Sequence, residues 1–168
     1  DYQNTLVMHV VAILGSTGYL GSHFVRGVEG KEWRALGLSR TEVDYSNVDH
    51  LSVWIRENKP AFLINAAGYT GKPNVDACER DKSDCLFGNA VLPGRIREVC
   101  EEHAIAWGHV SSGCIYSGTR ADGKGWREED EPNFSFRSPP CSFYSGSKAL
   151  GEEVLTGAEH CYVWRLRI

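Results

Sequence analysis

Tyr144 and Lys148 stand four residues apart in the stretch YSGSK, and both side chains can take part in proton transfer. On a helix this spacing places the phenol and the ammonium group on one face, close enough for each to shift the pKa of the other. A free phenol titrates near ~10, too high for easy proton exchange at neutral pH, so a neighbouring cation would favour catalysis. The same spacing also arises by chance in soluble chains, and the rest of the sequence must decide.

The stretch GSTGYLG is the second pattern that could do chemistry. It stands between the apolar run Val10–Leu14, typical of a buried strand, and a helical stretch with one apolar stripe. In that context Gly15 permits a tight turn, Gly18 lets the backbone approach a pyrophosphate, and Gly21 allows close helix–sheet packing. With the N–H groups of the helix start, this predicts dinucleotide binding, the alternative being a turn that happens to be glycine-rich. The residues expected to contact the dinucleotide here are Gly15, Ser16, Thr17, Gly18, Tyr19, Leu20 and Gly21.

The residues after the second expected strand indicate which dinucleotide is preferred. The stretch ALGLSRTEVDYSN places Ser39 and Arg40 where an acidic residue would bind the 2′-hydroxyl of NAD. An arginine can pair with a 2′-phosphate, so NADP is favoured as cofactor, with NAD as the other choice. The alternative is that Arg40 is a solvated loop residue. Asp44 is the candidate for the adenine edge, with Tyr45 beside it.

Strands and helices are expected to alternate along the whole chain. The expected strands are Val10–Leu14, Arg34–Leu38, the run AFLINAAG, Ile105–Val110 and Tyr162–Ile168. The expected helices follow the glycine loop, begin near Ser46, span Ser83 to His103, and carry Tyr144. This order indicates βαβ units and an α/β fold, namely a Rossmann-type doubly wound parallel sheet with helices on both faces.

We expect residues 1–168 to form a single domain, because a chain of 168 residues can bury one hydrophobic core. The chain ends on the apolar run YVWRLRI, from which we expect the N-terminal part of a longer protein, without its C-terminal substrate segment. The stretch from Gly118 to Ser142 is rich in Gly, Pro and charge, and predicts a long surface excursion of the kind that tends to serve ligands.

Composition and charge argue against several classes of protein. The formal net charge of −4 gives no reason to expect nucleic acid or a membrane surface as partner. No apolar run is long enough to cross a bilayer, and the start lacks a basic segment followed by a long apolar one. The six cysteines form no CxxC pair, so we expect no metal site and no disulfide framework, but reduced thiols in a cytoplasmic protein.

Four motifs occur in order along the chain: GSTGYLG, INAAG, VSSGCIY and YSGSK. On these motifs the chain resembles the extended short-chain dehydrogenase/reductases, the NAD-dependent epimerase/dehydratase superfamily, over essentially its whole length. Within the superfamily it is most similar to the dTDP-4-dehydrorhamnose reductases. The run NAAGYTGKPNVDACE is similar to the bifunctional 3,5-epimerase/4-reductases of nucleotide-rhamnose synthesis.

The resemblance implies catalytic roles for three residues. Tyr144 would protonate a keto oxygen as hydride arrives from the nicotinamide, while Lys148 would lower the pKa of Tyr144 and hold the nicotinamide ribose. Ser112 would hydrogen-bond the same keto oxygen, with Ser111 as the competing choice. The resemblance also implies further cofactor contacts at Ala66, Ala67, Gly68 and Asn89. It implies further substrate contacts at Thr70 and Asn74.

Two more residues carry hypotheses of their own. Cys114 stands where the epimerising relatives have a cysteine, and its thiolate could remove a proton beside the sugar ketone. The alternative is a small, buried, apolar side chain. Pro93 lies inside an expected helix and gives no N–H to the carbonyl of Asn89, which could then hold a water that contacts Lys148; the alternative is an ordinary kink.

The resemblance thus implies an NADP-dependent enzyme that reduces the 4-keto group of a 4-keto-6-deoxyhexose nucleotide, and that could also catalyse its 3,5-epimerisation. One rival is an NAD-dependent sugar-nucleotide epimerase or dehydratase that keeps its cofactor bound. Another is a catalytically silent, cofactor-binding regulatory subunit. The expected partners are the nucleotide sugar and a second copy of the chain, because the family often forms homodimers through helices flanking the sheet.

Overall fold

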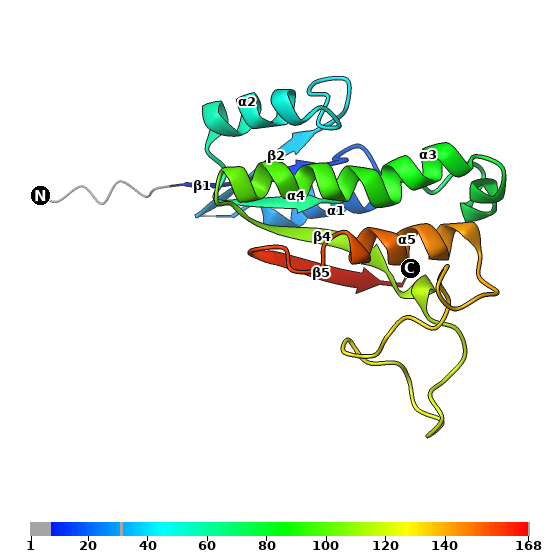
Figure 1. Ribbon diagram of the computed structural model, residues 1–168. Helices are drawn as coiled ribbons and strands as arrows, with labels where there is room; N and C mark the ends of the chain where they lie inside the picture. Colours follow the sequence, from blue (N-terminus) through cyan, green and yellow to red (C-terminus); the bar gives the residue numbers. More distant parts are fainter. Residues whose placement is uncertain (1–7, 31, 168) are drawn as a thin grey trace, which may run out of the picture. The chain divides into compact units, whose positions relative to one another are not determined.

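The computed structural model describes residues 8–30 and 32–167 (Figure 1). The strands are β1 (His9–Leu14), β2 (Trp33–Leu38), β3 (Phe62–Asn65), β4 (Ala106–Ser112) and β5 (Cys161–Leu166). The helices are α1 (Tyr19–Val28), α2 (Val48–Asn58), α3 (Lys82–Leu86), α4 (Leu92–Glu102) and α5 (Phe143–Glu153), with helical turns η1 (Val75–Glu79), η2 (Phe87–Val91) and η3 (Gly113–Ile115). The strands form a five-stranded sheet in the order β2-β1-β3-β4-β5, which confirms the predicted α/β fold.

The chain divides into two compact units. The first contains the residues up to Ala67, with Arg95–Gly108 and Glu159–Cys161. The second contains Gly68–Gly94, His109–Ala158 and the residues from Tyr162 onward. The glycine loop therefore belongs to the first unit, and the YSGSK helix to the second.

The three strands β1, β2 and β3 of the first unit bring their carboxyl ends to one edge. Leu14 at the end of β1 pairs with Leu38 at the end of β2 and with Asn65 at the end of β3. Ile13 and Leu14 are fully buried, as expected of an apolar strand covered on both faces. Because β1 lies between β2 and β3, the order of the strands reverses here, and open α/β sheets bind ligands at such a point.

Helix α2 of the first unit begins at a side-chain cap. Asn47 precedes it and accepts a hydrogen bond from the His50 N–H at 3.2 Å. Leu51 and Ile55, one turn apart, bury one face of the helix. The predicted start near Ser46 is thus confirmed to within two residues.

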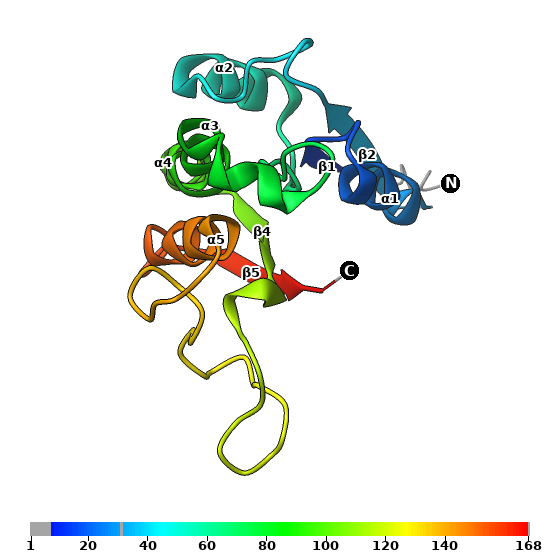
Figure 2. The ribbon, with the colours of Figure 1, turned by 90° about the vertical axis from the view of Figure 1, so that its right-hand side faces the viewer.

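Helix α5 of the second unit also starts at a capped position. Ser142 accepts a hydrogen bond from the Ser145 N–H at 3.1 Å. The helix lies beside α3 and η2, and the segment that precedes it extends away from the helices as a long loop (Figure 2). The predicted surface excursion is confirmed, since residues 118–141 contain no helix and only an isolated bridge between Ser135 and Ser138.

The long helix predicted from Ser83 to His103 is correct in extent but not in regularity. α3, η2 and α4 follow one another directly, and η2 is a π-helical turn. There the Leu92 N–H bonds to the Phe87 carbonyl, five residues back. Pro93 comes next and has no N–H to give to Asn89, so the wider turn lies where regular helical hydrogen bonding is interrupted.

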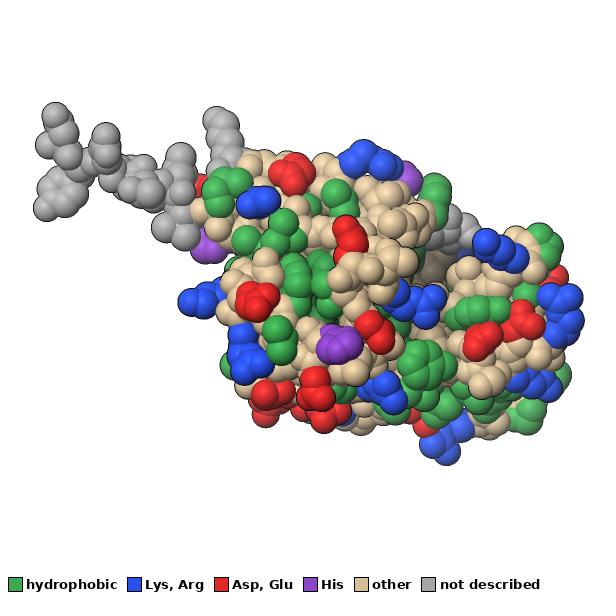
Figure 3. Space-filling view, turned by 90° about the horizontal axis from the view of Figure 1, so that it is seen from above, with side chains coloured by type: hydrophobic (Ala, Val, Ile, Leu, Met, Phe, Trp, Pro, Cys, Tyr) green, Lys and Arg blue, Asp and Glu red, His purple; other side chains and the backbone are tan. Residues whose placement is uncertain are grey.

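Acidic and basic side chains are interspersed over the face drawn in Figure 3. The described residues of that face therefore present no extended field of one sign, of the kind that draws in a polyanion. Among the described residues, no helix combines the length and the apolar character that crossing a membrane requires.

Candidate functional site

The glycine loop of the first unit is held by close backbone contacts. Gly15 has φ +73°, and its N–H and that of Ser16 donate to the Leu38 carbonyl at 3.1 and 3.2 Å. A Cβ on Gly15 would lie 2.9 Å from the backbone of Ala67, and one on Gly21 would lie 2.0 Å from the Gly15 carbonyl oxygen. Both positions therefore require glycine. The loop brings together the predicted cofactor residues of the first unit from Gly15 to Gly21 with Ala66 and Ala67, and its geometry fits a dinucleotide.

The turn after β2 contains a carboxylate that the sequence analysis did not place there. The Glu42 side chain accepts hydrogen bonds from the Ser39 N–H at 3.0 Å and from the Ser39 hydroxyl at 2.6 Å. These bonds hold the pKa of Glu42 below its usual value, so its carboxylate is ionised near neutral pH. Arg40, the predicted phosphate partner, is exposed beside them.

Asp44, the candidate for the adenine edge, and its neighbour Tyr45 already have partners in the protein. The Asp44 carboxylate accepts from the Ser46 hydroxyl at 2.5 Å and the Ser46 N–H at 3.2 Å, and these bonds lower its pKa. Tyr45 is buried with its phenol near the backbone of Gly15, and burial raises its pKa. The structure thus gives both residues a part in shaping the turn behind the glycine loop, and their cofactor contacts stay predictions.

In the second unit, Ser112 and Tyr144 meet. Ser112 ends β4 and is buried; its hydroxyl lies near enough to the Tyr144 phenol to lower the pKa of that phenol, and it accepts the Cys114 N–H at 3.2 Å. Ser111, the competing choice, donates instead to the Glu152 carboxylate at 2.5 Å. The geometry therefore favours Ser112 as the hydroxyl beside the tyrosine.

Lys148 is an amine held in the interior of the second unit. Its side chain is 6% exposed, and Nζ donates to the Val110 carbonyl at 3.0 Å. Burial lowers its pKa to about 8, while the Glu152 carboxylate one turn away acts in the opposite direction. A lysine with this pKa can both bind hydroxyl oxygens and exchange protons near neutral pH.

The expected lowering of the Tyr144 pKa by Lys148 is not what the structure shows. Burial raises the pKa of Tyr144, and the nearby Ser112 hydroxyl only partly offsets this. The physical reason is that the half-buried phenolate would lose hydration, while the ammonium of Lys148 is directed to Val110. Cys114 also lies near enough for its thiolate charge to disfavour a phenolate at Tyr144.

Asn89 was predicted to lie beside the nicotinamide, and both the oxygen and the nitrogen of its side-chain amide form hydrogen bonds within the protein. Its Oδ1 accepts the Tyr69 N–H at 2.9 Å, and its Nδ2 donates to the Tyr69 carbonyl at 2.9 Å and the Ser147 hydroxyl at 3.1 Å. A Cβ on Gly68 would lie 3.0 Å from Asn89 Oδ1 and 3.6 Å from Lys148 Nζ. Asn89 therefore fixes the chain after Gly68 beside Lys148.

The carbonyl of Asn89, which the Pro93 hypothesis assigned to a water, faces another helix. A Cβ on Gly151 would lie 2.1 Å from this oxygen, so α5 passes directly over it. This close packing favours the alternative in which the irregular turn at Pro93 has a structural role.

A cavity of about 340 Å³ in the second unit lies beside the predicted substrate residue Thr70. It is lined by Gly68, Tyr69, Thr70, Gly71, Lys72 and Asp81. The Tyr69 hydroxyl donates to Asp81 at 2.7 Å, which raises the pKa of Tyr69 to about 12. Asn74, the other predicted substrate residue, is not among the lining residues; its side chain accepts the Asp76 N–H at 3.0 Å and caps η1.

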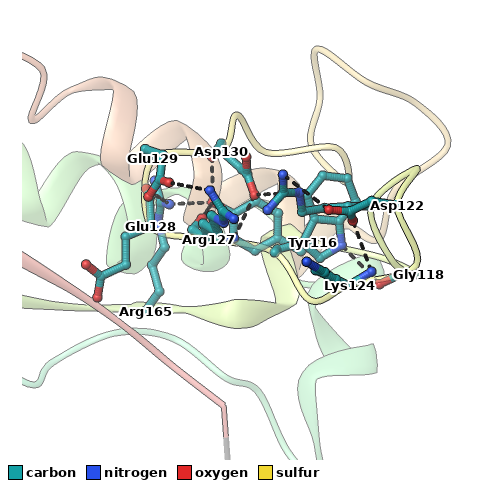
Figure 4. A network of polar contacts seen from close by, with 11 residues as sticks. Tyr116, Gly118, Asp122, Lys124, Arg127, Glu128, Glu129, Asp130 and Arg165 are labelled. Carbon is teal, nitrogen blue, oxygen red and sulfur yellow. Dashed lines mark hydrogen bonds and ion pairs between the residues drawn. The ribbon is translucent and has the colours of Figure 1, made fainter.

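A polar network that the sequence analysis missed supports the excursion after β4. Arg165 of β5 pairs with Glu152 at 2.7 Å. It also donates to the Tyr116 hydroxyl and to the Glu128 carbonyl (Figure 4). The Tyr116 hydroxyl in turn donates to the Asp130 carbonyl at 2.7 Å. Local sequence spacing gives no signal for these contacts, because the partners lie between 13 and 49 residues apart.

No group of His, Cys, Asp and Glu side chains within residues 8–30 and 32–167 is arranged to hold a metal ion. The described cysteines are free thiols, three of them buried.

Comparison with known proteins identifies a family and relatives that this chain resembles. The model of a family described as RmlD substrate binding domain matches residues 8–168. A bifunctional dTDP-4-dehydrorhamnose 3,5-epimerase/dTDP-4-dehydrorhamnose reductase of Arabidopsis thaliana is 35% identical over 162 residues, which cover 93% of this chain and 50% of that protein. The chain thus spans half the length of that relative.

Two solved structures share the fold. The L780 UDP-rhamnose synthase of Acanthamoeba polyphaga mimivirus has a TM-score of 0.79 at 24% identity, covering 96% of this chain and 56% of that one. A dTDP-4-dehydrorhamnose reductase of Bacillus anthracis in complex with NADP has a TM-score of 0.75 at 20% identity. The match covers 95% of this chain and 53% of that one.

Proposed function

Because this chain belongs to the RmlD substrate binding domain family, we propose that it serves the NADPH-dependent reduction of the 4-keto group of a 4-keto-6-deoxyhexose nucleotide. The observation that carries the proposal is the contact of Ser112 with Tyr144 beside the buried Lys148. The names of the Arabidopsis and mimivirus relatives point to the same substrate class, and the NADP complex of the Bacillus reductase to the same cofactor.

The proposed reduction needs a proton at the carbonyl oxygen of the substrate. The nicotinamide, when bound, supplies hydride to the carbonyl carbon. Tyr144 then gives its phenolic proton to the carbonyl oxygen, which Ser112 orients by a hydrogen bond. The raised pKa of Tyr144 keeps the phenol protonated until the oxygen becomes basic. Lys148, with its pKa of about 8, then returns a proton to the phenolate of Tyr144.

We propose 3,5-epimerisation as a second activity, because Cys114 lies next to the same pair. The thiol is half-buried and close enough to affect the pKa of Tyr144 electrostatically. A thiolate here could remove a proton from a carbon beside the ketone, with the negative charge passing to the carbonyl oxygen held by Ser112 and Tyr144.

Two single substitutions separate the reactions. Tyr144→Phe keeps the ring and removes the proton, so ketone reduction should fall by ~10²–10⁴. Cys114→Ser should slow deuterium uptake from solvent at the carbons beside the ketone, and leave reduction of an already epimerised substrate largely intact. NMR of a 4-keto-6-deoxyhexose nucleotide, recorded beside NADPH oxidation by the intact protein, measures both.

Reduction at the parent rate by Tyr144→Phe would overturn the assignment of the proton donor. Exchange at the parent rate by Cys114→Ser would leave a reductase without epimerase activity. The rival of a silent regulatory subunit predicts no turnover in the parent protein, and a resident-NAD epimerase predicts that purified protein retains its nucleotide. That the protein forms a homodimer stays a prediction, and the same purified protein can be used to test it.

A further inference from the structure

The end of β2 lies directly beside the glycine loop in the first unit. The Leu38 carbonyl accepts the N–H groups of both Gly15 and Ser16, and a Cβ on Gly37 would lie 2.7 Å from the Ser16 Cβ. Ser39, the next residue, therefore stands one step beyond the loop that would hold the pyrophosphate, where an adenosine ribose follows. Its N–H and hydroxyl are donors at the end of β2, where the 2′-substituent of a dinucleotide is read in this fold.

Both of these donors are taken by an anion from the chain itself. One oxygen of Glu42 accepts the Ser39 N–H at 3.0 Å and the Ser39 hydroxyl at 2.6 Å, and the Thr41 hydroxyl lies 2.9 Å from the Ser39 hydroxyl. Hydrogen bonds to a carboxylate are about twice as strong as neutral ones. The turn is thus an anion-binding arrangement that already contains its anion.

We propose that Glu42 is a specificity-determining residue that competes with a 2′-phosphate for the donors of Ser39 and so limits the preference for NADPH over NADH. A 2′-phosphate must displace the carboxylate or lie beside it, and like charges at such distances repel. The 2′-hydroxyl of NADH suffers no such repulsion and can itself donate to the carboxylate. Arg40 favours the phosphate and Glu42 opposes it, so the selectivity is the balance of the two. This inference rests on the cofactor named in the proposed function.

Two adenine nucleotides test the proposal without turnover. Adenosine 2′,5′-bisphosphate and 5′-AMP differ only in the 2′-phosphate, and calorimetry gives the affinity of the intact protein for each. Glu42→Gln keeps the shape and an acceptor oxygen but removes the charge, so the bisphosphate should bind about tenfold more tightly while 5′-AMP changes little. Glu42→Ala frees both Ser39 donors and should act in the same direction.

The matched control is Glu57→Gln, which removes the same charge from an exposed position on α2. Unchanged affinity of both Glu42 variants for the bisphosphate would overturn the proposal. An equal gain for both nucleotides, or an equal gain in Glu57→Gln, would also overturn it, since net charge would then explain the effect. A selective gain in a protein that reduces no keto sugar would support this inference and count against the proposed function.

Discussion

At the scale of single residues, the candidate site buries its amine more deeply than its phenol. Lys148 is 6% exposed and donates to Val110, whereas Tyr144 is half-buried and lies near Ser112. A charged lysine in this position costs folding free energy, because the interior solvates it less well than water does. Proteins keep such strain where a perturbed pKa is used in catalysis.

This cost predicts a pH dependence of stability. The pKa of Lys148 is about 8 in the folded protein and 10.5 in the unfolded chain, so between these values the unfolded state holds more protons. Stability should therefore rise with pH across this interval, by roughly 3 kcal/mol in all, and the full cost should be present below pH 8.

Comparison with Lys148→Met isolates the effect, because methionine fills similar space without titrating. Urea unfolding at several pH values from 7 to 10 should show the parent gaining stability relative to this variant. Lys124→Met, at an exposed loop position, is the control. A difference between parent and Lys148→Met that stays constant over the whole range would contradict the prediction.

At the scale of elements, the contact of α5 with the π-helical turn η2 positions the site. Gly151 of α5 lies against the Asn89 carbonyl, where a Cβ would be only 2.1 Å from the oxygen. Lys148 stands one turn earlier on the same helix, and the Asn89 side chain bonds to Ser147. The absent side chain at Gly151 therefore sets how closely Lys148 approaches Asn89.

Gly151→Ala should force the two elements apart. We expect a loss of about 1–3 kcal/mol in the free energy of unfolding, the usual result of overpacking, together with a fall in the proposed reductase activity. Gly94→Ala is the matched control, because a Cβ there meets nothing within 4 Å and alanine favours a helix. Urea unfolding of both variants measures the difference, and a Gly151→Ala protein as stable as Gly94→Ala would refute the packing argument.

The elements also show what could be read from the sequence and what could not. The run Val10–Leu14 and the helix with Tyr144 were predictable, because local periodicity reports burial. Pro93 indicated an irregularity in the helix, but the packing of Gly151 against the Asn89 carbonyl there could not be predicted, because Gly151 lies about 60 residues further along the chain.

At the scale of the whole molecule, the α/β fold predicted from the βαβ alternation is correct, whereas the order of the strands comes from the structure alone. The glycine loop and the YSGSK pair could be predicted because each is a short motif on one element. The pairing of Ser39 with Glu42 and the network around Arg165 were missed. Their partners are common polar residues, and only the fold decides which of them meet.

A nucleotide that binds only the folded chain should stabilise the whole of it. NADPH at one hundred times its Kd should add about 2.7 kcal/mol. For a chain of 168 residues this corresponds to a rise in Tm of roughly 5–10 °C, followed by thermal unfolding at increasing NADPH concentration. Gly18→Ala should reduce the rise, because Gly18 is expected to let the backbone approach the pyrophosphate, and a Cβ there would also lie 3.3 Å from the Gly15 carbonyl oxygen. Gly27→Ala, whose Cβ meets nothing within 4 Å in α1, should keep it. If NADPH raised the Tm of Gly18→Ala and of the parent equally, the nucleotide would not be held at the glycine loop.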